Sequence, residues 1–277
     1  MKRTVKSALA LLLAVLLLCR SALAGSAGTY TVDELYMELT VPEGYYVFDV
    51  HTVEKDPNLP SLGIDGAQMA QNLKAQNIYL DIVPEDLSWE LCLIMTEGET
   101  YQPIFDFNLF SGEVFVKMME EISDEYEEMG LTVQNWTEWQ GEQAKFFIID
   151  TTQTVQGGEV LRKQFYTIYN GQAINLTLIT SGGVITDEME TLQKTVAESI
   201  RFTKTFDPPQ EALDAAKAAG KKEPSILVSG LQGAVKGAIV GGLGYAIFHW
   251  LRKKKKEKEN ADELPAENEA STGGNDL

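Results

Sequence analysis

Histidine and cysteine are scarce in this chain, with 2 of each among 277 residues. Zinc sites and Ser-His-Asp or Cys-His catalysis draw on these side chains, so their shortage argues against both. Neither a Gly-x-Ser-x-Gly nucleophile motif nor a Gly-x-x-x-x-Gly-Lys phosphate loop occurs. We therefore predict no catalytic residues, no bound metal and no cofactor. The least favoured alternative is a hydrolase that uses His51, which lies in an expected loop.

Basic residues are also few: 23 Lys and Arg stand against 41 Asp and Glu, for a net charge of -18. Residues 25–204 hold 30 Asp and Glu against 9 Lys and Arg, a larger acidic excess than that of the whole chain, because many of the basic residues lie near the two ends. Such a surface repels nucleic acid and anionic lipid, so no nucleic-acid partner is expected. Divalent cations and basic partners remain possible, and solubility alone would also explain the charge.

The first 24 residues have the parts of a secretory signal peptide: a basic start, an apolar run at 8–18, and small residues at the end. The apolar run is shorter than the roughly 20 residues that a membrane-spanning helix needs. We predict cleavage after Ala24 and export of the chain that follows. An uncleaved anchor is the alternative, and it places the same domain outside.

Only one of the two cysteines is expected in the mature protein. Cys19 lies inside the signal peptide, and lipid attachment there is an alternative that the large neighbour Leu18 disfavours. Cleavage at Ala24 leaves Cys92 as the single thiol, so the domain has no internal disulfide and depends on core packing. Cys92 lies in the apolar run 91–95 and is interpreted as a small buried hydrophobe.

A second and longer apolar segment, residues 225–251, has the length of a transmembrane helix. A basic cluster follows it directly, formed by Arg252, Lys253, Lys254, Lys255 and Lys256. The positive-inside rule places such a cluster in the cytoplasm. We predict a single-pass protein of the cell membrane, with its N-terminal domain outside and a basic-then-acidic disordered tail, 252–277, inside.

Small residues recur along one side of the predicted span, at Ser229, Gly233, Gly237 and Gly241. A flat strip of this kind lets a second membrane helix approach closely, so these four are the candidate helix-packing residues, for another copy or a different protein. Lys236 also lies inside the span. It either extends toward the membrane surface or pairs with a partner's polar group.

Between these segments, residues 25–205 are predicted to form one extracytoplasmic α+β domain, and 206–224 a stalk with a short Ala-rich helix at 210–219. Asn170-Gly171 predicts a hairpin turn, and Thr186 is the expected N-cap of the helix that closes the domain, 186–200. This order favours an antiparallel sheet covered by helices. Strands are expected at 35–41 and 45–48 (as a pair), 89–95, 132–139, 144–151, 161–169 and 172–180, and helices at 66–78, 111–129 and 186–200.

Three stretches carry a resemblance to a known family: the opening 38–45 (ELTVPEGY), the late hairpin 166–176 (YTIYNGQAINL) and the closing 196–202 (VAESIRF). In these the domain resembles the PsbP-like α/β/α sandwich superfamily, over roughly its whole length. The resemblance implies a binding or assembly-support protein, often exported and membrane-attached in bacteria. It implies no functional residue, because these motifs specify turns and packing.

Two features could carry binding. The helix at 111–129 has an acidic cluster formed by Glu120, Glu121, Asp124, Glu125, Glu127 and Glu128. Hard-ion sites usually take ligands from a turning loop, so a solvated face is favoured over a calcium or magnesium site. Aromatic residues follow the turn at 42–44 (Tyr45, Tyr46 and Phe48) and stand three apart at Trp136 and Trp139. Those that face solvent would be binding anchors.

These patterns favour a non-catalytic, membrane-anchored binding or interaction module at the cell surface. The alternative is an accessory subunit of a membrane transporter or envelope complex, recruited through the span.

Overall fold

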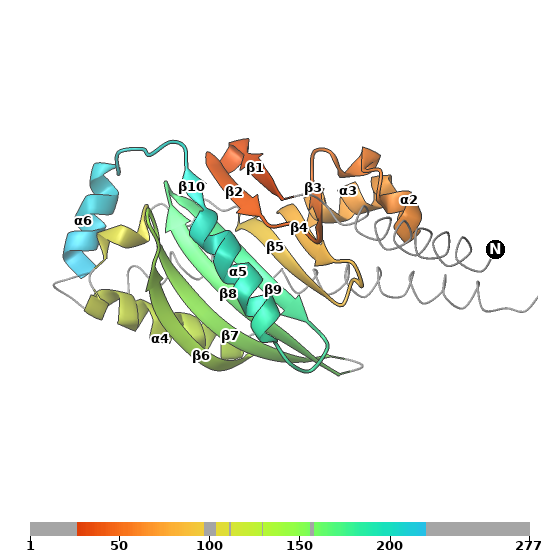
Figure 1. Ribbon diagram of the computed structural model, residues 1–277. Helices are drawn as coiled ribbons and strands as arrows, with labels where there is room; N and C mark the ends of the chain where they lie inside the picture. The colour runs from red at the N-terminus through yellow and green to blue at the C-terminus, as the bar shows by residue number, and fades with distance from the viewer. Residues whose placement is uncertain (1–26, 97–103, 111, 129, 156–157, 220–277) are drawn as a thin grey trace, which may run out of the picture.

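The computed structural model describes residues 27–96, 104–110, 112–128, 130–155 and 158–219 (Figure 1). The predicted signal peptide 1–24, the span 225–251 with its packing residues, the cluster 252–256 and the tail to 277 lie outside these residues. No helix in the described ranges is both long and apolar enough to cross a membrane.

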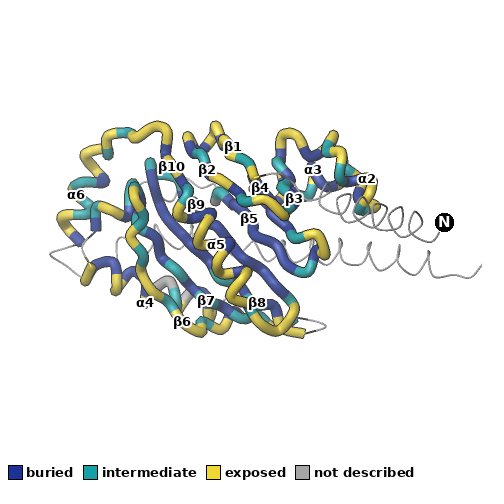
Figure 2. The backbone as a smooth tube through the Cα atoms, viewed as in Figure 1, coloured by how far each residue is buried: buried dark blue, intermediate teal, exposed yellow. Residues whose placement is uncertain are grey.

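The described residues form a seven-stranded antiparallel sheet with the strand order β3-β4-β5-β9-β8-β7-β6. Its central strands β5 and β9 are buried along most of their length (Figure 2). Both faces are therefore covered, since an exposed face would alternate with polar residues. The strands are β3 Tyr45–Asp49, β4 Ile78–Pro84, β5 Trp89–Thr96, β6 Thr132–Gln140, β7 Lys145–Val155, β8 Gly158–Tyr169 and β9 Gln172–Thr180.

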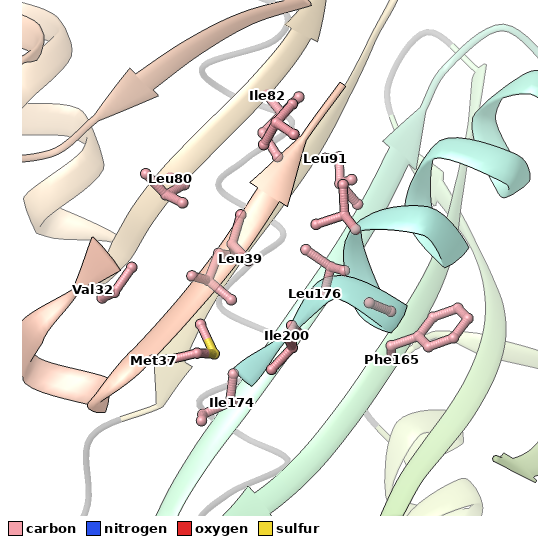
Figure 3. Packing of buried hydrophobic residues seen from close by; sticks show 14 of the residues in the cluster. Val32, Met37, Leu39, Leu80, Ile82, Leu91, Phe165, Ile174, Leu176 and Ile200 are labelled. Atoms are coloured by element: carbon pink, nitrogen blue, oxygen red, sulfur yellow. The ribbon is translucent and has the colours of Figure 1, made fainter. Parts of the chain in front are cut away.

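One face carries a small second sheet and a helix. The strands β1 (Gly28–Val32), β2 (Met37–Val41) and β10 (Arg201–Phe202) form a three-stranded sheet in the order β1-β2-β10, and α5 (Asp187–Ser199) lies beside it. Figure 3 shows side chains of β2, β4, β5 and β9 meeting in the layer between. Gln193 of α5 donates from Nε2 to the carbonyls of Lys163 and Leu176, which ties the helix to the sheet.

The opposite face is covered at its two flanks by different elements. The turns η3 (Val53–Lys55) and α2 (Leu59–Leu62) and the helix α3 (Gly66–Ala75) pack against β3 and β4 in one apolar cluster. The turn η5 (Phe107–Leu109) and the helix α4 (Gly112–Glu128) pack against β6, β7 and β8 in another. The arrangement is a mixed α/β fold of antiparallel sheets with several helices.

The predicted pairing of 35–41 with 45–48 is wrong. Residues Asp33–Leu35 form the turn η2, and β2 then pairs with β1 and β10, whereas β3 pairs with β4. Gly44 does make a tight turn, with φ at +99°. The two strands nevertheless enter different sheets, β2 the three-stranded one and β3 the seven-stranded one.

The predicted helix at 66–78 is too long. It ends at Ala75, and Ile78 begins the strand β4, which the sequence reading missed. Asn77 at φ +52° separates the two elements. Ile78 fits the helical spacing of Met69, Ala70 and Leu73, and the largely buried strand that it begins has no alternation to reveal it.

Several other expected elements are confirmed. Helix α4 covers most of 111–129, and β5 to β9 fall at the expected places. Asn170 and Gly171 both have positive φ, +56° and +74°, as a two-residue hairpin turn requires. Thr186 caps α5, accepting the backbone N–H of Met189 at 3.4 Å.

The Ala-rich helix α6 (Gln210–Ala219) lies against the domain. Ala212 and Ala219 are buried, and Ala219 belongs to the apolar cluster under α4. Before it, Phe206 lies edge-on to Tyr36, with ring centroids 5.3 Å apart. The predicted stalk 206–224 therefore begins as a segment that packs on the domain, and its role beyond residue 219 stays a prediction.

Candidate functional site

An open cleft of about 590 Å³ lies where two turns meet the start of α5. The turn before β3 contributes Glu43, and Tyr45 begins that strand. The β4–β5 turn contributes Glu85 and Asp86, Trp89 begins β5, and α5 contributes Glu188. Three chain segments far apart in sequence thus form one surface feature.

Local backbone chemistry builds the rim of this cleft. Gly44 makes the first turn at φ +99°, and Leu87 closes the second at φ +54°, donating its N–H to the carbonyl of Pro84 at 3.0 Å. The Asp86 carboxylate accepts the N–H of Ser88 at 2.9 Å, a common turn-stabilising bond. The side chains of Glu43, Glu85 and Asp86 consequently stand on short, tightly turned segments, whereas Glu188 stands in the first turn of α5.

Two aromatic rings line the inner part of the cleft. Tyr45 and Trp89 have ring centroids 5.7 Å apart at an interplanar angle of 59°. Partial burial raises the pKa of the Tyr45 phenol, and the nearby Glu188 carboxylate, hydrogen-bonded to it, raises that pKa further. The phenol therefore stays protonated at neutral pH.

The cleft has the electrostatics of a site for cations. Glu43, Glu85, Asp86 and Glu188 are all exposed there, and no Lys or Arg is among the described residues that line it. No ion pair between described residues involves Glu43, Glu85 or Glu188. Carboxylates beside aromatic faces attract ammonium and guanidinium groups through charge and through the ring quadrupole.

A second polar cluster lies inside the fold, on the face that carries α3 and α4 and between the areas they cover. Asp81 of β4 stands directly across from Cys92 of β5, which stands across from Thr177 of β9. Glu90 lies two residues before Cys92, on the same face of β5, and Arg162 lies two strands away on β8. All five side chains are buried.

Burial dominates the chemistry of this inner cluster. It raises the pKa of Asp81 to about 7, although a hydrogen bond from Cys92 opposes the shift. It also raises the pKa of Glu90 well above its ordinary value, with Asp81 adding to the rise and Arg162 opposing it. The pKa of the Cys92 thiol rises for the same reason, and the two carboxylates raise it further.

The structure places most of the described residues singled out from the sequence outside both clusters. His51 is at the surface, with Nε2 2.9 Å from a Glu34 carboxylate oxygen. On α4, Glu120, Asp124, Glu127 and Glu128 are exposed, and the side chains of Glu121 and Glu125 lie outside the description.

The aromatic residues are sorted by strand alternation. Tyr46 and Phe48 are buried under α3, whereas Tyr45 points to the other face and lines the cleft. Trp136 and Trp139 belong to opposite faces of β6, the first beside Phe147 and the second beside Phe146 and Phe165.

Neither the acidic cleft nor the inner cluster was predicted from the sequence. The available signal was a carboxylate inside an otherwise apolar strand, as in Leu80-Asp81-Ile82 and Trp89-Glu90-Leu91. A charge at such a position is costly unless something compensates it, so it marks a site.

No family model matches the sequence, and no curated protein matches it either. Among solved structures, the cyanobacterial PsbP (CyanoP) of Synechocystis sp. PCC 6803 is similar, with 13% identity over 64% of this chain and 92% of that chain, and a TM-score of 0.37. A protein of unknown function from Pseudomonas aeruginosa, PA94, a putative regulator, shows 11% identity over 67% of this chain and 100% of that chain, with a TM-score of 0.30. These likenesses assign no activity.

Proposed function

We propose that this chain is an exported, non-catalytic binding protein held in the cell membrane by one helix. The signal-peptide pattern of 1–24, the apolar segment 225–251 and the basic cluster 252–256 support this placement. The domain 25–205 is then outside, and the C-terminus is cytoplasmic.

We further propose that the domain is PsbP-like. The late hairpin 166–176 is the β8–β9 turn at the centre of the large sheet. The closing segment 196–202 joins the end of α5 to β10, beside the opening strand β2. The opening stretch 38–45 runs from β2 to the start of β3, so the three stretches lie in the large sheet and in the layer that covers one of its faces.

The binding site in this proposal is the acidic cleft, and its ligand is a lysine- or arginine-rich segment of a partner protein. The observation that carries it is the convergence of four carboxylates and two aromatic rings at one cleft. The carboxylates come from three separate segments around an open surface, which suits several side chains of an extended peptide. Exposed charges of this kind set specificity and association rate more than affinity.

The test is calorimetric titration of the full chain, in detergent, with a short peptide rich in lysine and arginine. We expect the double variant Glu85→Gln, Glu188→Gln to bind about tenfold more weakly, because each exposed charge pair contributes up to about 1 kcal/mol. The affinity should also fall with added salt.

The matched control removes the same charge from the exposed side of α4, by Glu120→Gln with Glu127→Gln. It should bind the peptide like the wild type. Equal weakening by both double variants would assign the binding to the general acidic surface and reject the cleft. A wild type that does not bind the peptide would also reject the cleft.

A second candidate is an accessory subunit of a membrane transporter or envelope complex. The observation that favours it is the strip of small residues at Ser229, Gly233, Gly237 and Gly241. In a membrane two-hybrid assay of the full chain, Gly237→Leu should abolish self-association while Leu243→Ala, on the bulky side, should not. Wild type without self-association would leave a different protein as the partner, and equal association by all three would remove the strip's role in self-association.

A further inference from the structure

We propose that Asp81, Glu90 and Cys92 form a binding site for a divalent transition-metal ion, for which Zn²⁺ fits best. One carboxylate oxygen of Asp81, one of Glu90 and the Sγ of Cys92 all lie within 4.8 Å of one another. All three side chains are fully buried, at 0% exposure. The site is separate from the acidic cleft and does not depend on the function proposed for it.

The ligands stand on rigid, paired strands. Asp81 on β4 and Cys92 on β5 are direct cross-strand partners. Glu90 lies two residues before Cys92, on the same face of β5. Side chains on one face of a sheet recur every second residue, so the spacing Glu-x-Cys sends both groups to the same side. The strand register thus brings the three donors together before any ion arrives, which favours binding.

The separation between Cys92 and Asp81 is close to that of a tetrahedral site. Zinc is bound at about 2.0–2.2 Å by carboxylate oxygen and at about 2.3 Å by thiolate sulfur. Two such ligands at a tetrahedral angle stand roughly 3.5 Å apart. The distance from Cys92 Sγ to Asp81 Oδ1 is 3.7 Å. The three side chains would occupy three positions and leave the fourth open.

Unpartnered oxygens point independently to a missing ligand. Both carboxylate oxygens of Glu90 and the Oδ2 of Asp81 are buried without a hydrogen-bond partner among the described residues. Thr177 Oγ1, across from Cys92, is in the same condition. Buried polar atoms are normally paired, because an unpaired one costs about 1–3 kcal/mol, and charged ones more. A bound cation would supply the partner.

Charge and donor type select the class of ion. Two carboxylates and a thiolate carry three negative charges, and Arg162 with a divalent ion brings three positive charges. Binding releases the thiol proton, and any carboxyl proton, to solvent. Calcium and magnesium prefer oxygen donors alone, whereas a thiolate ligand favours zinc and its neighbours.

The test uses the full chain carrying Cys19→Ser, in which Cys92 is the single thiol. We expect about one zinc per chain after expression with zinc and removal of loosely bound metal, measured by elemental analysis. Replacement of zinc by Co²⁺ should produce a thiolate-to-cobalt charge-transfer absorption and the strong visible bands of a tetrahedral site. This readout needs no ligand variant to fold.

Variants then assign the ligands. Cys92→Ser should lose the thiolate band, and Glu90→Gln should weaken cobalt affinity at least tenfold, as loss of a direct ligand exceeds the about 10- to 100-fold effects of outer contacts. Glu120→Gln, on the exposed side of α4, should change neither. A single-thiol chain that binds no cobalt, or binds it without a thiolate band, would overturn the proposal. So would equal weakening by Glu90→Gln and Glu120→Gln.

Discussion

Two glycines at helix starts test how closely the backbone of this fold is packed. Gly66 is the first residue of α3, and a Cβ there would collide with the backbone carbonyl of Glu54. Gly112 is the first residue of α4, and a Cβ there meets nothing within 4 Å. The same substitution should therefore destabilise the domain at Gly66 and not at Gly112.

We expect Gly66→Ala to destabilise the domain by about 1–3 kcal/mol, because the neighbouring carbonyl belongs to the main chain and cannot rotate away. Gly112→Ala should be neutral or stabilise by up to about 1 kcal/mol, by restricting the unfolded chain. Denaturant titration of both variants measures the difference. A loss of stability at Gly112 equal to that at Gly66 would contradict the packing shown here.

A buried hydrogen bond joins α4 to strand β8 of the large sheet. Tyr126 donates from Oη to Gln164 Oε1 at 2.6 Å, and both side chains are buried. Burial also raises the pKa of Tyr126, so the phenol remains a donor across the ordinary pH range. We expect Tyr126→Phe to cost about 1–3 kcal/mol, because Gln164 loses its partner in a dry setting.

Tyr169→Phe provides the comparison for that prediction. The Tyr169 hydroxyl is 2.9 Å from Thr205 Oγ1 in a part-buried position, where water can replace the lost bond. Thermal unfolding of both variants should show the larger decrease in Tm for Tyr126→Phe. A smaller decrease there than at Tyr169 would contradict the buried bond.

At the scale of single elements, α5 offers two threonines with different roles. Thr186 caps the helix, whereas Thr191 lies inside it and donates from Oγ1 to the carbonyl of Asp187. We expect Thr186→Ala to destabilise by about 1 kcal/mol through loss of the cap. Thr191→Ala should stabilise by up to about 0.7 kcal/mol, since alanine is the better residue inside a helix.

Chemical unfolding of the two variants compares one substitution at two places in one helix. Opposite signs would confirm that the cap, and not the threonine side chain in general, holds the start of α5. A loss at both positions would show that Thr186 contributes through contacts other than the cap.

At the scale of the whole molecule, the membrane placement can be tested with single cysteines in intact cells. Val184 is 58% exposed on the domain and Ser271 lies in the predicted tail. A membrane-impermeant maleimide should label Val184→Cys and should label Ser271→Cys only after permeabilisation. The native Cys92 is buried and should give little background. Labelling of Ser271→Cys in intact cells would reverse the proposed topology.

The sequence by itself determined the local features of this protein. The helix α4 follows from apolar residues at helical spacing with Gly130 at φ +81° as its end, and the turn at Asn170-Gly171 follows from residues that tolerate positive φ. Thr186 marked the start of α5 because a cap bonds only to its own helix. Each of these depends on neighbours a few residues away, which is why a sequence pattern was enough.

Only the tertiary structure decided which distant residues meet. It sent β2 and β3 to different sheets, and it brought Asp81, Glu90 and Cys92 together through strand register. It likewise joined Glu43, Glu85 and Glu188 at one cleft, although they come from three separate segments. Strand pairing links residues far apart in the chain, and its energy comes from packing over whole faces. No local pattern specifies that choice, so the two candidate sites became visible only in the folded molecule.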